Sequence, residues 1–321
     1  MSSNPNFPDG LNIHPSSSFA SSGSVQPEFE AYSHSGQEKA IQQYGIAGRN
    51  REAAYALRIY SNPPLNVLFD PPFPRPDGRL TMIELGSGSG LVGSSIARSL
   101  KQGDTIILTD LPEVCTLLKE NVSQSKVDSE IVHVKPLAWG NLEHASKIQE
   151  ELLESRGGLT HILCSDLVRV FPLLIPILHI SCEQVYFPEL LAPLLRSLIQ
   201  LSAPSFSRHD VQVIISYKIR SLSKETPFWS AFGLWFSFEP VLERDLLPDG
   251  SESIWRRFGS HMEGPIFIFV ARRRPESVTW NVPVDDKDLL AGVGAYGTLQ
   301  PKESDAFESL LFMVLNEGDG E

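Results

Sequence analysis

Apolar and polar residues alternate with two different periods between residues 80 and 271. Short apolar runs alternate with longer segments in which apolar residues recur every three or four positions. The first pattern predicts buried strands and the second predicts amphipathic helices. Strands are expected at 80–85, 105–109, 130–135, 160–164, 211–217, 236–242 and 265–271, and helices at 91–100, 112–122, 142–153, 188–200 and 227–235. This order predicts an α/β fold with a mostly parallel sheet and helices on both faces.

The two ends of the chain lack this regular pattern. Residues 1–36 are rich in Ser, Asn, Pro and Gly and are expected to be disordered. A short helix is expected at 51–60, and a run of prolines separates it from the first strand. The pattern ends near Pro275, and residues 276–321 form a mostly polar tail. A helix near 307–315 is expected either to dock or to stay loose.

A glycine-rich loop follows the first predicted strand. Glu84 lies at the tip of that strand, before the glycines, and Gly86, Gly88 and Gly90 precede the next helix. Glycine allows a tight turn and a close approach of ligand to backbone, and the free N–H groups of a helix start bind anions. Residues 88–93 also match the dinucleotide pattern G-x-G-x-x-G. The loop therefore predicts a nucleotide or nucleoside cofactor site and leaves a nicotinamide cofactor open.

Two further side chains follow the second and third strands. Asp110 ends the second strand, where a carboxylate can accept hydrogen bonds from ribose hydroxyls. Trp139 follows the third, where an indole can stack on adenine for about 0.5–1.5 kcal/mol beyond its buried area. A dinucleotide enzyme would carry a similar carboxylate, and a tryptophan here can equally serve as a core or cap aromatic. Together the two residues favour a nucleoside at this edge.

Four short motifs occur in order at 84–90, 108–110, 137–140 and 165–168. In this order they resemble the seven-strand methyltransferases of lysine methyltransferase family 16, over roughly residues 37–275. The resemblance implies a seven-stranded, mostly parallel Rossmann-like sheet whose last strand, at 265–271, is antiparallel. It also implies S-adenosylmethionine as the cofactor. The residues that would bind it are Glu84, Gly86, Gly88, Gly90, Asp110, Trp139 and Asp166.

The fourth motif is interrupted by an insertion. The family carries Asp-x-x-Tyr after the fourth strand, but here Asp166 is followed by Arg169, and the expected Tyr186 appears 17 residues late. Removing residues 169–185 would place Tyr186 directly after Val168 and restore the motif Asp-x-x-Tyr. We hypothesise that this segment is a retained intron; the alternative is a genuine loop insertion. A longer loop costs only about 1–2 kcal/mol of closure entropy, so we expect the fold to survive. We expect activity to be impaired, because misplacing a catalytic group by about 1 Å can lower a rate roughly a hundredfold.

The resemblance further implies methylation of a protein lysine, with a translation factor or chaperone as partner. A free lysine has a pKa near 10.4, so its neutral form costs roughly 4 kcal/mol near pH 7.4. Asp166 and Tyr186 are the candidate catalytic residues that would position this amine. Two alternatives stay open: an NAD-dependent oxidoreductase that shares the glycine loop, and a non-catalytic methyltransferase-like binding protein.

Composition excludes several other classes of protein. The formal net charge of −12 argues against a protein that coats nucleic acid. The three cysteines form neither a disulfide framework nor a zinc-binding spacing. Neither a signal peptide nor an apolar run of membrane-spanning length is evident. We therefore expect a cytoplasmic monomer with no metal, nucleic-acid or membrane partner.

Overall fold

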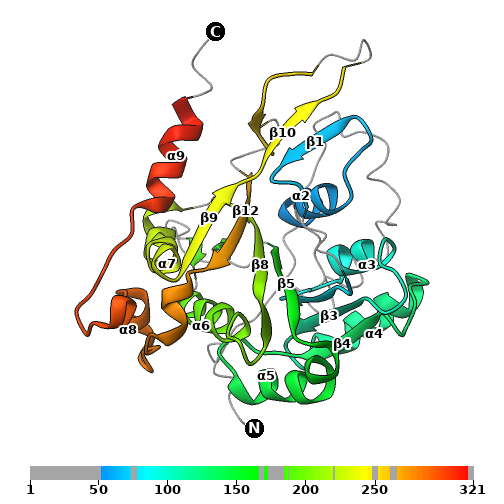
Figure 1. Ribbon diagram of the computed structural model, residues 1–321, viewed down its shortest axis with the longest axis horizontal. Coiled ribbons are helices and arrows are strands. Elements are labelled where there is room, and N and C mark those ends of the chain that lie inside the picture. The colour runs from blue at the N-terminus through cyan, green and yellow to red at the C-terminus, as the bar shows by residue number, and fades with distance from the viewer. Residues whose placement is uncertain are drawn as a thin grey trace, which may run out of the picture.

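A seven-stranded sheet forms the centre of the molecule in the computed structural model (Figure 1). The structure describes residues 52–73, 78–165, 170–172, 184–186, 188–219, 221–247, 252–260 and 266–316. In spatial order the strands are β4 (Val132–Pro136), β3 (Thr105–Asp110), β2 (Thr81–Leu85), β5 (Leu159–Ser165), β8 (Ser207–Lys218), β12 (Ile266–Arg273) and β9 (Phe236–Pro240). The pairs from β4 to β8 are parallel, whereas β12 is antiparallel to both neighbours. The expected fold class and the reversed last strand are confirmed.

Helices cover both faces of this sheet, as the alternating pattern predicts. One face is covered by α2 (Glu52–Ser61), α3 (Leu91–Ala97) and α4 (Cys115–Gln124), and the other by α5 (Leu142–Ile148), α6 (Leu191–Leu201) and α7 (Leu222–Trp235). Successive strand residues point to opposite faces. Met82 therefore packs in the core under α2, α3 and α4, and its neighbour Ile83 packs in the core under α5, α6 and α7. Burial on both faces explains why the strands read as continuous apolar runs.

A small second sheet was not expected from the sequence. It consists of β1 (Val67–Asp70), β10 (Leu242–Asp245) and β11 (Arg256–Arg257), all antiparallel. The run expected as one strand at 236–242 is divided between β9 and β10, and Val241 lies buried between them. These strands are short and partly exposed, so their local pattern is weak.

Packed structure continues beyond Pro275, where the sequence pattern alone places the end of the folded part. Helix α8 (Asp286–Leu290) contacts α6, and helix α9 (Ala306–Asn316) contacts α7 (Figure 1). Phe307 is fully buried, and its ring stacks on that of Trp229 with centroids 4.7 Å apart. The C-terminal helix therefore docks on the same core as the sheet. Of the helices in the described part of the chain, none is long and apolar enough to cross a bilayer. The segment 1–36, expected to be disordered, lies outside the described residues.

Candidate active site

The glycine loop lies at the carboxyl end of β2 and leads directly into α3. Gly86, Gly88 and Gly90 have φ values of +63°, +54° and +79°, a region that side chains disfavour. The Ser87 amide donates to the carbonyl of Thr109 at 2.8 Å, which ties the loop to the neighbouring strand β3. The loop is therefore held in a shape that only glycine adopts readily.

Glu84 fastens the beginning of α3 to β2. Its side-chain Oε2 accepts a hydrogen bond from the Gly93 amide at 3.1 Å. A Cβ built on Gly93 would lie 2.0 Å from Leu108 Cδ2, so the third glycine of the pattern is required by packing. Glu84 is only 1% exposed, and this burial raises the pKa of its carboxyl to about 8. The sequence shows an acid before the glycines but not that it points into the protein.

Asp110 holds the same loop from the end of β3. Its Oδ2 accepts from the Gly88 amide and its Oδ1 from the Leu111 amide, both at 2.8 Å. Burial raises the pKa of this carboxyl to about 6, and the two amide donors oppose the shift. Each carboxylate oxygen can accept a second hydrogen bond. Asp110 thus has acceptor capacity for ligand hydroxyls while it shapes the loop.

The turn that carries Trp139 is fixed by two helices. Gly140 has a φ of +76°, and its amide donates to Ser197 Oγ of α6 at 2.8 Å. The Ala138 amide donates to His144 Nδ1 of α5 at 3.1 Å. Trp139 itself is half-buried and packs on the core of that face. Sequence reasoning missed Ser197, because nothing in its local pattern pairs it with a turn so distant in the chain.

The expected catalytic residues follow the end of β5. Cys164 pairs with Leu85, the residue before Gly86, so β5 ends beside the glycine loop. Asp166 lies outside the described residues. Tyr186 lies on β7 (Gln184–Tyr186), which pairs antiparallel with β6 (Val170–Pro172) in the register Val170↔Tyr186. The side chain of Tyr186 is not among the described parts of the chain.

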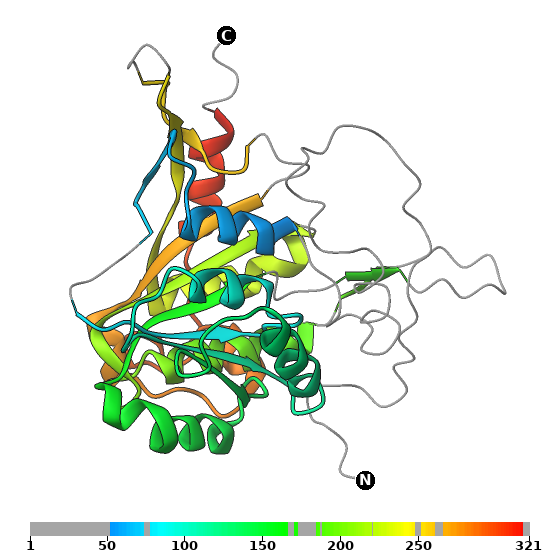
Figure 2. The ribbon, with the colours of Figure 1, turned by 90° about the vertical axis from the view of Figure 1, so that its right-hand side faces the viewer.

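This short hairpin changes how the insertion should be understood. Paired residues of an antiparallel ladder have Cα atoms about 4.5–5.5 Å apart. Backbone pairing therefore returns the chain at Tyr186 to within one strand spacing of Val170, four residues after Asp166. Figure 2 shows the hairpin projecting away from the central sheet. The pairing therefore brings Tyr186, which directly follows the insertion, beside Val170 near the beginning of the insertion.

The groups that the sequence singled out converge on one edge of the sheet. Strands β4, β3, β2 and β5 are adjacent and parallel, so their carboxyl ends share that edge. The Trp139 turn, Asp110 and the glycine loop lie at the carboxyl ends of the first three, beside the end of β5. This edge fits an adenosine-containing cofactor. It offers a loop backbone that only glycine adopts readily, the Asp110 carboxylate with spare acceptor capacity, and the half-buried indole of Trp139. In the described ranges, no group of His, Cys, Asp and Glu is arranged to hold a metal ion.

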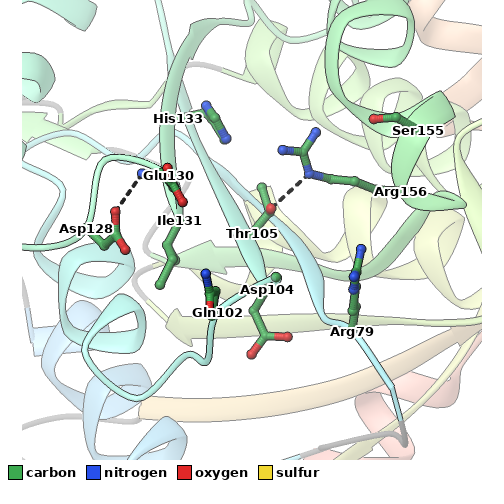
Figure 3. Close-up of a pocket in the computed structure, with 11 residues that line it drawn as sticks. Arg79, Gln102, Asp104, Thr105, Asp128, Glu130, Ile131, His133, Ser155 and Arg156 are labelled. Atoms are coloured by element: carbon green, nitrogen blue, oxygen red, sulfur yellow. Dashed lines mark hydrogen bonds between the residues drawn. The ribbon is translucent and has the colours of Figure 1, made fainter.

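A cavity of about 490 Å³ lies elsewhere, lined by the beginning of β3 and the approach to β4 (Figure 3). Arg79 and Arg156 line it together with Asp104, Asp128 and Glu130, and Arg156 Nε donates to Thr105 Oγ1 at 2.9 Å. Among the residues that the structure describes, none of those predicted for the cofactor or for catalysis lines this cavity. Its mixed charges match neither a simple anion nor a simple cation.

Two yeast proteins are similar in sequence to parts of this chain. Protein-lysine N-methyltransferase EFM2 of Saccharomyces cerevisiae is 40% identical over 68 residues, which cover 20% of this chain and 16% of that protein. Protein-lysine N-methyltransferase EFM6 of the same yeast is 30% identical over 100 residues, 29% of this chain and 40% of that protein. The matched stretches thus span less than half of either relative.

Two methyltransferases are among the solved structures that the chain matches. The mitomycin 7-O-methyltransferase MmcR is 11% identical with a TM-score of 0.40, covering 74% of this chain and 56% of that one. An O-methyltransferase from Bacillus cereus is 12% identical with a TM-score of 0.38, covering 76% and 92%. Residues 43–232 match the family described as lysine methyltransferase. Because this match covers more than half of the sequence, the chain belongs to the lysine methyltransferase family, whose methyl donor is S-adenosylmethionine.

Proposed function

We propose that this methyltransferase transfers a methyl group to a lysine side chain of a protein. The observation that carries the proposal is the convergence of the glycine loop, Asp110 and Trp139 beside the end of β5. Membership of the lysine methyltransferase family and the names of both yeast relatives support it. The same family match removes the reason to prefer a nicotinamide oxidoreductase, which rested on the glycine loop alone.

The proposed cofactor contacts lie at the edge of the sheet that carries the glycine loop. Asp110 accepts hydrogen bonds from the ribose hydroxyls, and Trp139 stacks on the adenine. The backbone at Gly86, Gly88 and Gly90 lets the ligand approach closely. Glu84, expected from sequence to touch the cofactor, acts in this proposal by holding α3 through the Gly93 amide. When bound, S-adenosylmethionine supplies an electrophilic methyl group on its sulfonium.

The proposed acceptor side is formed by Asp166 and Tyr186. Methyl transfer requires a neutral amine, so the site must favour loss of the ammonium proton and orient the nitrogen lone pair. The Asp166 carboxylate would hold the arriving lysine, and the Tyr186 hydroxyl would accept a hydrogen bond from its nitrogen. The Val170↔Tyr186 pairing supports this assignment, since it keeps Tyr186 near the chain that follows Asp166. Residues 169–185 still lengthen this connection, and we propose that they reduce activity.

The proposed partner is a protein with an accessible lysine, in the class of translation factors or chaperones. A net charge of −12 favours association with a basic surface. We further propose that the enzyme acts as a cytoplasmic monomer and binds neither nucleic acid nor membrane.

A labelling experiment tests the proposed function. Purified protein is incubated with methyl-radiolabelled S-adenosylmethionine and cell extract, and labelled proteins are hydrolysed and analysed for methyl-lysine. We expect a labelled band that contains methyl-lysine. The variant Asp166→Asn should reduce this labelling at least tenfold, and the exposed control Asp210→Asn should preserve it. Label in another amino acid or in a small molecule would contradict the lysine assignment. Binding of S-adenosylhomocysteine without any transfer would indicate a non-catalytic binding protein.

A further inference from the structure

A fully buried carboxylate lies where β8 connects to α7. Glu225, in the first turn of α7, is 1% exposed, and it accepts hydrogen bonds from the Tyr217 hydroxyl and from the Ser221 amide, the latter at 3.2 Å. Tyr217 is 3% exposed, and its ring meets that of Trp229 edge-on at 5.1 Å. Burial of a carboxylate is costly unless donors satisfy it. Glu225 therefore links the end of strand β8 to the first turn of helix α7.

Three consecutive residues at the end of β8 each bind a different group. Ser216 Oγ donates to the carbonyl of Ala53 at 2.6 Å, and Lys218 forms an ion pair with Glu52, so both bind α2. Tyr217, between them, points to the opposite face and binds Glu225 of α7. The end of β8 is thus clamped from both faces of the sheet.

The register of the sheet places this clamp beside the end of β5, the strand that precedes the proposed acceptor residue Asp166 in the chain. β5 and β8 are parallel, and Ser165 pairs with Ser216. Ser165 directly precedes Asp166 in the chain, as Ser216 directly precedes Tyr217. A shift of β8 at this level would be passed to the strand that leads into the acceptor site. Misplacement of about 1 Å can reduce a rate on the order of a hundredfold.

We propose that Glu225 is a positioning residue for methyl transfer. Through Tyr217 and the Ser221 amide, it links the end of β8 to the beginning of α7 next to the end of β5. This inference rests on the proposed function, and neither Glu225 nor Tyr217 is expected to touch the substrate, because both are buried.

Three variants test the role of the pair by kinetics. Glu225→Leu keeps a similar volume and removes both acceptors, Tyr217→Phe removes one donor, and Glu225→Gln keeps an acceptor. We expect Glu225→Leu to lower kcat at least tenfold, with the KM for the protein substrate and the Kd of S-adenosylhomocysteine each changed less than twofold. Tyr217→Phe should lower kcat less, and the double variant should be no worse than Glu225→Leu, because the two residues act together. Glu225→Gln should recover most of the rate, and the exposed control Ser223→Ala should retain it.

Two kinetic outcomes would overturn the inference. One is an unchanged kcat in both Glu225→Leu and Tyr217→Phe. The other is a fall in rate that follows only the folded fraction measured by thermal unfolding, since that would show a purely structural role. Hydrogen exchange at the Ser221 amide provides a readout without catalysis: it should be at least tenfold faster in Glu225→Leu, and unchanged exchange would refute the placement. A wild-type protein that binds S-adenosylhomocysteine but transfers no methyl group would instead refute the proposed function.

Discussion

The Glu84 carboxyl group accepts a hydrogen bond from the Gly93 amide at 3.1 Å, and a Cβ on Gly93 would lie 2.7 Å from the same oxygen. The close packing of the end of strand β2 against the beginning of helix α3 therefore depends on both residues. Glu84 satisfies an amide in the first turn of the helix, which has no partner within it. Gly93 leaves the space in which the Glu84 carboxyl group fits. The acid and the last glycine of the loop sequence form one structural unit.

Gly93→Ala should destabilise the protein. The added methyl group would lie 2.0 Å from Leu108 Cδ2, and Leu108 is fully buried, so the core must shift. Overpacking of this kind costs about 1–3 kcal/mol, and we expect the upper end of that range. Urea unfolding of the variant measures the loss, with Ser95→Ala on the same helix as the control. Equal stability of the two variants would contradict the packing argument.

The buried Glu84 should make stability fall at alkaline pH. Burial raises its pKa from 4.5 to about 8, so the folded protein keeps a proton that the unfolded chain releases. This contribution to stability is complete below pH 4.5 and is lost as pH rises through 8. Between pH 6 and pH 9, the free energy of unfolding should fall by about 2–3 kcal/mol more in wild type than in Glu84→Gln, which stays neutral. Urea titrations at the two pH values test this, and parallel curves would refute it.

Asp110 should make cofactor affinity depend on pH. Burial raises its pKa from 3.8 to about 6, and only the ionised carboxylate accepts hydrogen bonds with both oxygens. Between pH 7 and pH 5 the ionised fraction falls about tenfold, so the Kd of S-adenosylhomocysteine should rise about tenfold. Calorimetric titration across this range should show a midpoint near pH 6 that Asp110→Asn abolishes and Asp210→Asn preserves. An identical profile in Asp110→Asn would remove Asp110 from the cofactor site.

Trp139→Ala should weaken binding of S-adenosylhomocysteine about 2- to 12-fold. Loss of a stacked indole is worth about 0.5–1.5 kcal/mol beyond its buried area, and 1.4 kcal/mol corresponds to a tenfold change. Trp139→Phe should retain most of the affinity, because a phenyl ring can still stack. The half-buried Trp255, which lies under the Arg244 guanidinium in the small sheet, provides the control Trp255→Ala. If calorimetry gives the same Kd for both alanine variants, Trp139 does not stack on the adenine.

Deletion of residues 169–185 should increase methyl transfer without changing cofactor affinity. The deletion restores the spacing between Asp166 and Tyr186 and shortens a loop, which should also stabilise the fold by about 1 kcal/mol. Rates of both forms with the substrate found by labelling, together with the Kd of S-adenosylhomocysteine, test this expectation. Equal rates would show that the β6–β7 hairpin already places Tyr186 correctly.

Expectations from the sequence succeeded where the pattern is local and strong. The strand expected at 80–85 is β2 (Thr81–Leu85), and the strand expected at 105–109 is β3 (Thr105–Asp110). Both are buried on two faces, so they carry unbroken apolar runs that end at a loop. The small sheet escaped notice because β1 and β10 are short and partly exposed. Their pairing joins Val67 to Asp245, and no local signal connects residues so far apart.

By itself, the sequence determined the class of fold, the order of its strands and helices, and the loop at which a nucleoside cofactor is expected. These features follow from residue periodicity and from backbone shapes that only glycine adopts readily, and both are local properties. Tertiary structure alone decided that Glu84 faces inward, that Ser197 supports the Trp139 turn and that Phe307 stacks on Trp229. Those contacts join distant segments, and they depend on which face of the sheet each side chain enters once the whole chain is packed.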